Sequence, residues 1–418
     1  MSLVIIDGIR TPFAKMGTTL ASADAVELGR IAVTALLART GFDPEQVDET
    51  IFGCVSQPFD AANIARVIAL RAGIPKSKPA MTVHRNCASS LESLTTAAER
   101  AAAGHGEVFI VGGTESMSRV PLLFSAAAVA KFAALARAKT WGGKAAAALR
   151  FRPGDFAPIA GLRQGLHDPV ANLNMGETAE VLAREFGISR SEQDAFALAS
   201  HQRAAAARDL LREEMCPAYL SGVKGGFVMD DNGVRANQTM EALAKLPAVF
   251  ERNTGTVTAG NSSQITDGAV AMLVMAEAKA ESLGLTPLGR LVDHAYAGCD
   301  PARMGLGPAY AIRKLAVRCG LKPSDADVIE INEAFAVQVL AVGQLSRTPD
   351  FAAAGLEIPM EKVNPNGGAI ALGHPVGSSG GRIVLTALKH LQRTGGKRAL
   401  CTLCIGGGQG GAVWVERP

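Results

Sequence analysis

The side chains best suited to chemistry are two cysteines and a histidine, and the first of them is Cys87. It follows a strand-like segment, 81–83, and precedes a helical pattern over 88–103. Amide groups and the macrodipole at a helix N-terminus favour an anion, so they bias a thiol there toward the nucleophilic thiolate. A buried cysteine that only fills space is the competing interpretation, and the placement alone leaves both open.

His374 lies in the glycine-rich stretch 364–381, where Pro375 fixes the turn directly after it. A helical pattern runs from Gly377 to Gln392, so we expect the histidine on a tight loop before a helix. An isolated His-Pro pair is typical of a buried turn with a hydrogen-bonded imidazole. Only residues elsewhere in the chain can favour a functional interpretation.

The second thiol is Cys404, which ends the strand-like segment 398–404 in the sequence Cys401-Thr-Leu-Cys404. A redox pair would need both cysteines at a helix start, and a zinc site would need a second pair of ligands. We therefore favour one working thiol, Cys404, and strand alternation should point Cys401 to the opposite face. The run 406–411 matches G-x-G-x-x-G, but a strand pattern follows it. We therefore interpret this run as a source of backbone amide donors for an oxyanion, and not as a dinucleotide-binding loop.

Two polar segments are ambiguous by themselves. Asn332-Glu333 separates a strand pattern from a helical pattern over 333–344, where an asparagine is a good N-cap. The segment 258–263 precedes a buried strand pattern and is typical of a turn.

Alternating strand and helix patterns in both parts of the chain predict an α/β protein with a largely parallel sheet and helices on both faces. Residues 114–249 break this alternation and are expected to form a large insertion. A shift of 291 residues aligns the helix after Cys87 with the helix after Gly377, and strand 108–111 with 399–402. The sequence thus predicts two similar α/β halves.

The composition argues against several other classes. The 418 residues suffice for two or three domains. The net charge, 42 − 39 = +3, is too small to argue for nucleic acid. The apolar runs are too short for a membrane span, and no signal peptide pattern precedes 3–6. Seven scattered cysteines fit a reducing compartment, so we expect a cytoplasmic protein without disulfides, and the spacing predicts no metal site.

One part of the insertion is strongly basic. Seven Lys and Arg residues and no acid lie between Ser116 and Gly154, with aromatic and leucine side chains among them. A basic amphipathic element of this kind could lie on a membrane surface or a partner, notably through 120–152. A solvated helical hairpin packed on its own protein is equally compatible with the pattern.

Together these residues resemble the thiolase family. Six motifs run in the family's order along nearly the whole chain, and jointly they are very specific. They are Asn86-Cys87-Ala88-Ser89, 112–117, 255–261, Asn332-Glu333-Ala334-Phe335, 367–375 and 404–408. The basic insertion also resembles, more weakly, that of the β-subunit in trifunctional β-oxidation complexes.

The resemblance implies the thiolase fold, with two similar α/β halves of layered sheets and helices and an inserted helical loop domain. The expected N-terminal half comprises 1–119 with 250–287, the loop domain 120–249, and the C-terminal half 288–418. The implied reaction is cleavage of a 3-ketoacyl-CoA by CoA, which is a co-substrate, with no permanently bound cofactor. The expected setting is fatty-acid β-oxidation.

The resemblance also implies roles for individual residues. His374 would take the proton of Cys87, which would attack the 3-keto carbon, and Cys404 would protonate the acetyl-CoA enolate and later activate CoA. Asn332 would hold a water in one oxyanion hole, and Gly406 would donate to the other. The family's CoA channel is matched by Ser263, Met175 and Phe335.

Two residues depart from the family pattern. Ser90 replaces a frequent glycine, so the helix after Cys87 is expected to pack differently, and Asn174 stands where short-chain enzymes often have histidine. The second departure favours a longer or different acyl group. The expected partners are acyl-CoA and CoA, a second or further copies in a homodimer or tetramer, and a hydratase/dehydrogenase α-subunit. Two alternatives are a non-catalytic CoA binder and a ketoacyl-carrier-protein synthase. The set of two thiols and one imidazole argues against both.

Overall fold

The computed structural model describes residues 2–220 and 226–418. The chain forms two compact units, one made of Met1–Arg119 with Asp168–Pro418 and the other of Val120–His167. We describe each unit by itself, and the predicted domain limits stay predictions. No helix among the described residues is long and apolar enough to cross a membrane.

The larger unit is built on one sheet of ten strands, in the order β14-β15-β16-β13-β1-β12-β5-β3-β4, with β2 paired to β12. The strands are β1 (Leu3–Arg10), β2 (Ala14–Lys15), β3 (Glu49–Gly53), β4 (Ala80–Val83), β5 (Val108–Ser116), β12 (Thr266–Ala276), β13 (Gly289–Gly298), β14 (Val328–Ile331), β15 (Arg398–Ile405) and β16 (Gln409–Glu416).

The sheet is mixed, so the prediction of a largely parallel sheet was wrong. The pairs β3–β4, β3–β5 and β14–β15 are parallel. The pairs that involve β1, β12, β13 or β16 are antiparallel. One reason is local: β16 returns directly alongside β15 through a glycine turn in which Gly407 and Gly408 have φ of 90° and 78°. A hairpin of this kind reverses the strand direction.

The sheet confirms the prediction of two similar halves. In the first half, β3 pairs parallel with β5, and β12 and then β1 follow antiparallel. In the second half, β14 pairs parallel with β15, and β16 and then β13 follow antiparallel. The two halves join where β1 pairs antiparallel with β13.

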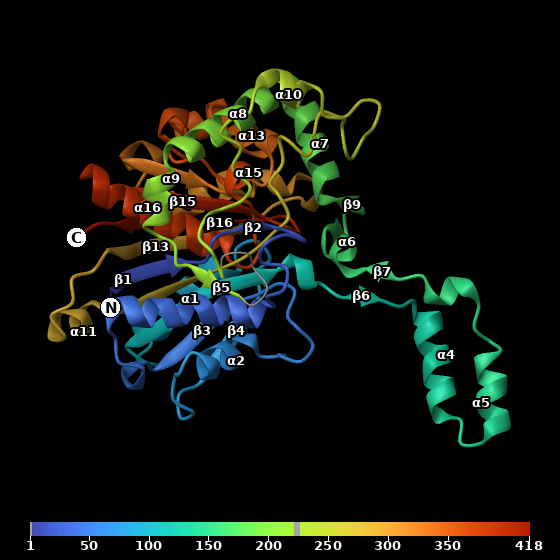
Figure 1. Ribbon diagram of the computed structural model, residues 1–418. Helices are drawn as coiled ribbons and strands as arrows, with labels where there is room; N and C mark the ends of the chain where they lie inside the picture. The colour runs from blue at the N-terminus through green and yellow to red at the C-terminus, as the bar shows by residue number, and fades with distance from the viewer. Residues whose placement is uncertain (1, 221–225) are drawn as a thin grey trace. The chain divides into compact units, whose positions relative to one another are not determined.

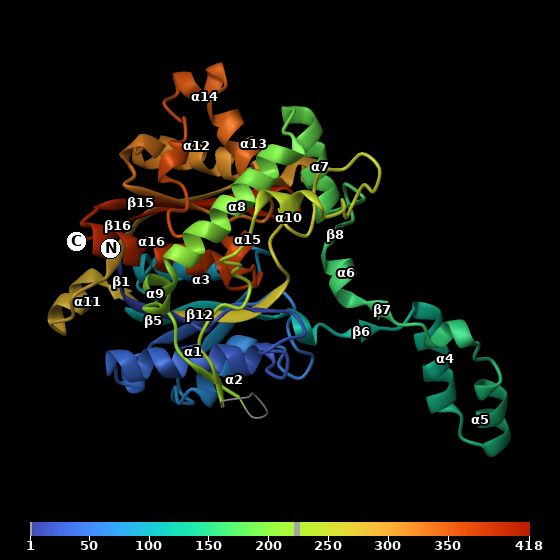
Figure 2. The same ribbon diagram turned by 45° about the horizontal axis from the view of Figure 1, so that its top comes forward.

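Helices cover both faces of each half, as predicted (Figures 1 and 2). Two helices, α1 (Ala25–Thr40) and α2 (Ile64–Arg71), pack on the outer face of the first half. Two other helices, α12 (Gly307–Cys319) and α13 (Ala336–Ser346), pack on the outer face of the second half. Between the halves lie α3 (Ser89–Ala102) and α16 (Ser379–Thr394), whose apolar side chains share one core with strands of both.

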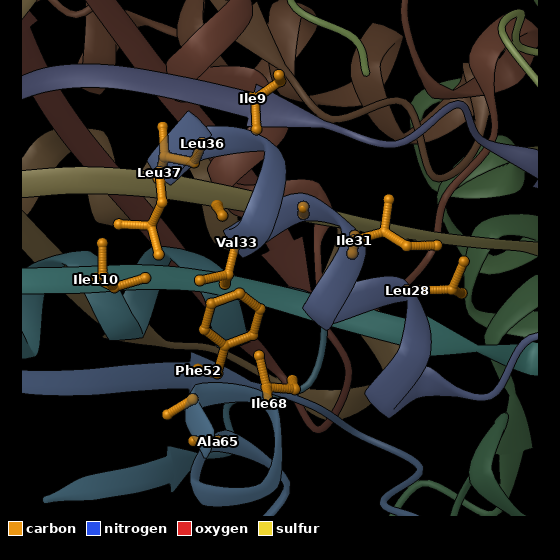
Figure 3. Packing of buried hydrophobic residues seen from close by; sticks show 14 of the residues in the cluster. Ile9, Leu28, Ile31, Val33, Leu36, Leu37, Phe52, Ala65, Ile68 and Ile110 are labelled. Atoms are coloured by element: carbon orange, nitrogen blue, oxygen red, sulfur yellow. The ribbon is translucent and has the colours of Figure 1, made fainter. Parts of the chain in front are cut away.

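The outer core of the first half shows how small residues allow this packing (Figure 3). Phe52 and Ile110 of the sheet face Leu28, Val33 and Leu36 of α1. A Cβ atom on Gly29 would lie 2.4 Å from Cδ1 of Ile68, so glycine there lets α1 approach α2.

Helix ends agree with sequence signals where the signals are local. Asp24 caps α1 by accepting a hydrogen bond from the Glu27 amide, and Gly41 ends it in the left-handed region, as predicted. The helix expected from Glu333 begins only at Ala336, so that prediction was wrong. The reason is a tertiary contact, because Ser262 forms a β-bridge with Phe335 and holds the intervening backbone extended.

The segment of the larger unit from residue 168 to the start of β12 carries four helices: α7 (Met175–Phe186), α8 (Arg190–Ala206), α9 (Arg208–Arg212) and α10 (Met240–Ala244). Ser189 caps α8 in a capping box with Glu192.

The smaller unit is a helical hairpin on a short two-stranded base. The hairpin consists of α4 (Ala126–Arg137) and α5 (Trp141–Ala148), β6 (Leu122–Leu123) pairs antiparallel with β7 (Ile159–Ala160), and the short helix α6 (Gly161–Gly165) follows. Four phenylalanine rings form a cluster with centroids 4.9–6.1 Å apart, in which Phe132 and Phe151 are partly buried and Phe124 and Phe156 are exposed.

Candidate active site

Cys87 lies in a tight turn between β4 and α3. Asn86, directly before it, has a φ of 43°, in the left-handed region that few non-glycine residues adopt. The Ser89 hydroxyl closes the turn, because it accepts a hydrogen bond from the Arg85 amide (3.0 Å) and donates one to the Asn86 carbonyl (2.7 Å). The cysteine is therefore presented on a rigid, hydrogen-bonded backbone.

The glycine turn after β15 contacts this cysteine from the other half of the molecule. The Asn86 side-chain amide donates a hydrogen bond to the Gly406 carbonyl over 2.7 Å. Gly406 is thereby held beside the turn that carries Cys87, and its backbone lowers the pKa of the Cys87 thiol.

The resting state of Cys87 differs from the expected thiolate. Burial raises the pKa of Cys87 to about 11, although the Gly406 amide opposes this rise. Desolvation of a charged sulfur outweighs the favourable helix terminus. Cys87 therefore rests as a thiol at neutral pH, and its activation needs a base.

His374 lies on the loop between α15 (Ala369–Leu372) and α16. Its Nδ1 lies 2.5 Å from Oγ of Ser379, and that hydroxyl donates to the Pro375 carbonyl over 3.1 Å. When the Ser379 hydroxyl donates to Pro375, Nδ1 carries the hydrogen that Ser379 accepts, and this tautomer leaves a lone pair on Nε2. Nε2 is buried without a hydrogen-bond partner among the described residues.

The imidazole is neutral as well as correctly oriented. Burial, together with the nearby Arg382 guanidinium, lowers the pKa of His374 to about 4. A neutral imidazole with a free Nε2 lone pair can accept a proton at physiological pH.

Packing of α3 against α16 brings the nucleophile turn and the histidine loop together. Oγ of Ser90, on the first turn of α3, accepts a hydrogen bond from the Gly381 amide on the first turn of α16 (2.8 Å). Ser90 thus links the two helices at the ends that carry Cys87 and His374.

Cys404 lies on β15 on the opposite face from Cys401, as strand alternation predicted. Cys401 packs in the core between the halves, whereas Cys404 packs in a separate cluster with Phe335 and Leu306. Burial raises the pKa of Cys404 well above that of a free thiol, and the neighbouring Cys87 raises it further. The Cys87 sulfur therefore lies close enough to affect the ionisation of Cys404.

Asn332 follows β14 at the edge where β14 and β15 end. Its amide donates to the Thr402 carbonyl (3.0 Å), which places it beside the end of the strand that carries Cys404. Both polar atoms of its side chain are buried without a hydrogen-bond partner among the described residues. The N-cap interpretation was wrong because the next helix begins at Ala336. A buried, unpaired amide suits a bound water or a substrate oxygen.

The three residues predicted to contact CoA surround this region. Met175 lies next to Gly406, because a Cβ on that glycine would be 3.4 Å from Sδ of Met175. Phe335 packs in one cluster with Cys404. The Ser263 amide donates to the Ala334 carbonyl (2.9 Å). The side-chain oxygen of Asn174 accepts a hydrogen bond from the Gly176 amide and caps α7, so this side chain has a structural role.

The sequence analysis missed two supporting residues. Ser379 orients His374, and Glu115 accepts hydrogen bonds from the amides of Val55 (3.1 Å), Ser56 (2.9 Å) and Gly377 (3.0 Å). Glu115 thereby ties the histidine loop to the end of β3. Their only signal was their position inside the glycine-rich motifs. Ser379 lies five residues after its partner His374, whereas the partners of Glu115 lie on other segments.

Comparisons with known proteins agree with this arrangement. Residues 3–278 match the thiolase N-terminal domain, and residues 285–417 match the thiolase C-terminal domain. The chain is 40% identical to an acetyl-CoA acetyltransferase of Syntrophomonas wolfei, over 99% of this chain and 98% of that protein. It is also 40% identical to a 3-ketoacyl-CoA thiolase of Yersinia enterocolitica, over 99% and 96% of the two chains. Human mitochondrial 3-ketoacyl-CoA thiolase in complex with CoA superposes with a TM-score of 0.87, at 38% identity, over 100% of this chain and 98% of that chain.

The fold and these comparisons define an enzyme that transfers acyl groups. The chain belongs to the thiolase family.

Proposed function

We propose that the protein cleaves 3-ketoacyl-CoA with CoA, yielding acetyl-CoA and a shortened acyl-CoA, and that it serves fatty-acid β-oxidation in the cytoplasm. The observation that carries this proposal is that Gly406 is held against the turn of Cys87 by the hydrogen bond from Asn86 to its carbonyl (2.7 Å), with a second thiol, Cys404, two residues before it on β15. A nucleophile and an oxyanion donor in contact are what acyl transfer to a cysteine requires.

In the first half-reaction, Nε2 of His374 takes the proton of Cys87, and the thiolate attacks the 3-keto carbon. The bond between C2 and C3 then breaks, and its electron pair stays on C2 as the enolate of acetyl-CoA. Cys404 gives its proton to C2, while the acyl group remains on Cys87 as a thioester. Asn332 holds a water near the enolate oxygen.

In the second half-reaction, the Cys404 thiolate takes the proton of the CoA thiol. The CoA sulfur attacks the thioester, with its oxyanion facing the Gly406 amide. The Cys87 thiolate leaves and recovers its proton from His374. Each donor of this kind contributes about 3–4 kcal/mol to the transition state in other acyl-transfer enzymes.

The decisive experiment separates the two thiols. Cys87→Ala should abolish thiolysis without loss of fold. Cys404→Ala should accumulate an acyl group on Cys87, visible as added mass on the intact protein after incubation with an acyl-CoA. Thiolysis at the normal rate by the Cys87 variant would refute the nucleophile assignment.

Substrate range and assembly complete the proposal. We infer a longer or different acyl group than acetoacetyl, and acetyl-CoA release from a chain-length series of 3-ketoacyl-CoAs tests it. We also propose a homodimer or tetramer that associates with a hydratase/dehydrogenase subunit. Co-purification of such a subunit, and the mass of the native assembly, test that part.

A further inference from the structure

The smaller unit, Val120–His167, carries a charge of opposite sign to the rest of the chain. It has seven Lys and Arg residues and one acid, Asp155, so its formal charge is 7 − 1 = +6. The remainder has 42 − 7 = 35 cations and 39 − 1 = 38 acids, which gives −3. The positive charge is therefore concentrated in 48 residues, and an anionic partner of this unit would be attracted to it specifically.

Most of this charge faces solvent. Lys131 pairs with Asp155 over 2.6 Å, which neutralises the single acid. The other cations are all exposed and are distributed along both helices and the segments after them: Arg137, Lys139, Lys144, Arg150, Arg152 and Arg163. Arg137 and Arg150 flank the region spanned by α5, about 12 Å long. A spread of this kind suits an extended anionic surface better than one compact phosphate group.

Large apolar side chains are exposed among these cations. Trp141 is 89% exposed and Leu149 is 86% exposed, at the two ends of α5. Leu122, Val129 and Phe156 are also more than half exposed. Within the unit α5 has no buried residue, and Ala128 is the buried residue of α4. The hairpin therefore presents apolar area that its own small core does not cover.

We propose that the α4–α5 hairpin is a docking element for an anionic lipid surface. Tryptophan and basic residues together are typical of segments at the boundary between headgroups and acyl chains. A nucleic acid offers no apolar phase for Leu149 and Leu122, and a single CoA molecule is too small for the spread of cations. The connection 138–140 places Lys139 and Trp141 at the tip of the hairpin, and Lys144 lies 5.9 Å from the Trp141 ring (Figure 1).

The tryptophans provide a direct assay on the full-length protein. The chain has two, and Trp414 is 1% exposed in the core, so only Trp141 can change its environment on docking. Vesicles of equal parts phosphatidylglycerol and phosphatidylcholine should shift its emission to the blue and carry the protein upward in flotation. Vesicles of phosphatidylcholine alone should bind far more weakly, and high salt should release the protein.

Matched variants test the charge contribution. Lys139→Gln with Lys144→Gln should weaken binding on the order of 25-fold, from roughly fivefold per cation near an anionic surface. Arg71→Gln with Lys76→Gln removes two exposed cations from the other unit and should leave binding unchanged. Trp141→Ala should abolish the emission shift and weaken flotation. Circular dichroism and thiolysis without lipid confirm that each variant is folded.

Several results would overturn the proposal. Equal binding to neutral vesicles, or an equal loss in both double variants, would exclude an electrostatic role for this hairpin. Displacement from vesicles by CoA would assign the cations to the substrate instead. Failure of the wild-type protein to float with anionic vesicles would leave a protein partner as the ligand of this surface.

Discussion

Ser379→Ala removes one hydroxyl that does not contact the reacting atoms in the proposed reaction, yet it should slow that reaction. This hydroxyl lies 2.5 Å from Nδ1 of His374 and 3.1 Å from the Pro375 carbonyl, so it can accept the Nδ1 hydrogen while it donates its own to Pro375. It thereby keeps the lone pair on Nε2, where the Cys87 proton must arrive. Without it, the neutral ring can carry its hydrogen on either nitrogen, and the donor at Nδ1 loses its buried acceptor.

The magnitude follows from that lost acceptor. A buried donor left without a partner costs about 1–3 kcal/mol. If this cost falls on the competent tautomer, kcat should decrease roughly 5- to 150-fold, while KM should change little. Acetyl-CoA release from a 3-ketoacyl-CoA under saturating CoA measures both. Ser379→Thr keeps the hydroxyl and should recover most of the activity.

A neighbouring serine supplies the matched control. The Ser378 hydroxyl donates to the same Pro375 carbonyl over 3.0 Å and, among the described residues, makes no hydrogen bond to the imidazole. Ser378→Ala therefore loses a comparable buried hydrogen bond without freeing Nδ1, and it should reduce stability about 1 kcal/mol but retain kcat. The reasoning fails if Ser379→Ala keeps the wild-type kcat, or if Ser378→Ala loses as much.

Two further predictions concern stability. A Cβ on Gly377 would lie 2.4 Å from the Thr114 carbonyl oxygen, so Gly377→Ala should lower the free energy of unfolding by about 1–3 kcal/mol in urea. Gly142→Ala, which meets nothing within 4 Å, should not lower it. Burial lowers the pKa of His201 to about 4, from 6.5 when free, so the unfolded chain takes up this proton first as the pH falls. The neutral His201 therefore supports stability fully above pH 6.5. Between pH 6.5 and 4 the free energy of unfolding should fall by at most about 3 kcal/mol because of this residue. His201→Gln should remove that part of the pH dependence. An unchanged slope in this variant would show that other groups cause the acid sensitivity.

The sequence predicted those features that depend on neighbouring residues. Asp24 and Gly41 mark the ends of α1, because capping is decided within one turn of the helix. The strand directions were predicted poorly, since β12 pairs with β5 across the whole insertion and no local pattern encodes that register. The same limit applies to the site. Cys87 could be placed at a helix start, but the burial that raises its pKa comes from segments far away in the chain.

The repeated halves explain why the site needs both of them. The offset of 291 residues that relates the halves also separates Ser90 from Gly381, whose hydrogen bond joins α3 to α16. The same offset relates Gly113 on β5 to Cys404 on β15, since 404 − 113 = 291. In the first half this position must be glycine, because a Cβ would lie 2.0 Å from the Gly377 carbonyl oxygen of the histidine loop. In the second half it carries a thiol beside Cys87. The two halves therefore offer equivalent strand positions with different uses. Gly113 leaves room for the loop that carries His374, and Cys404 supplies the second sulfur. A side chain at Gly113 should consequently displace the histidine loop while leaving both cysteines in place.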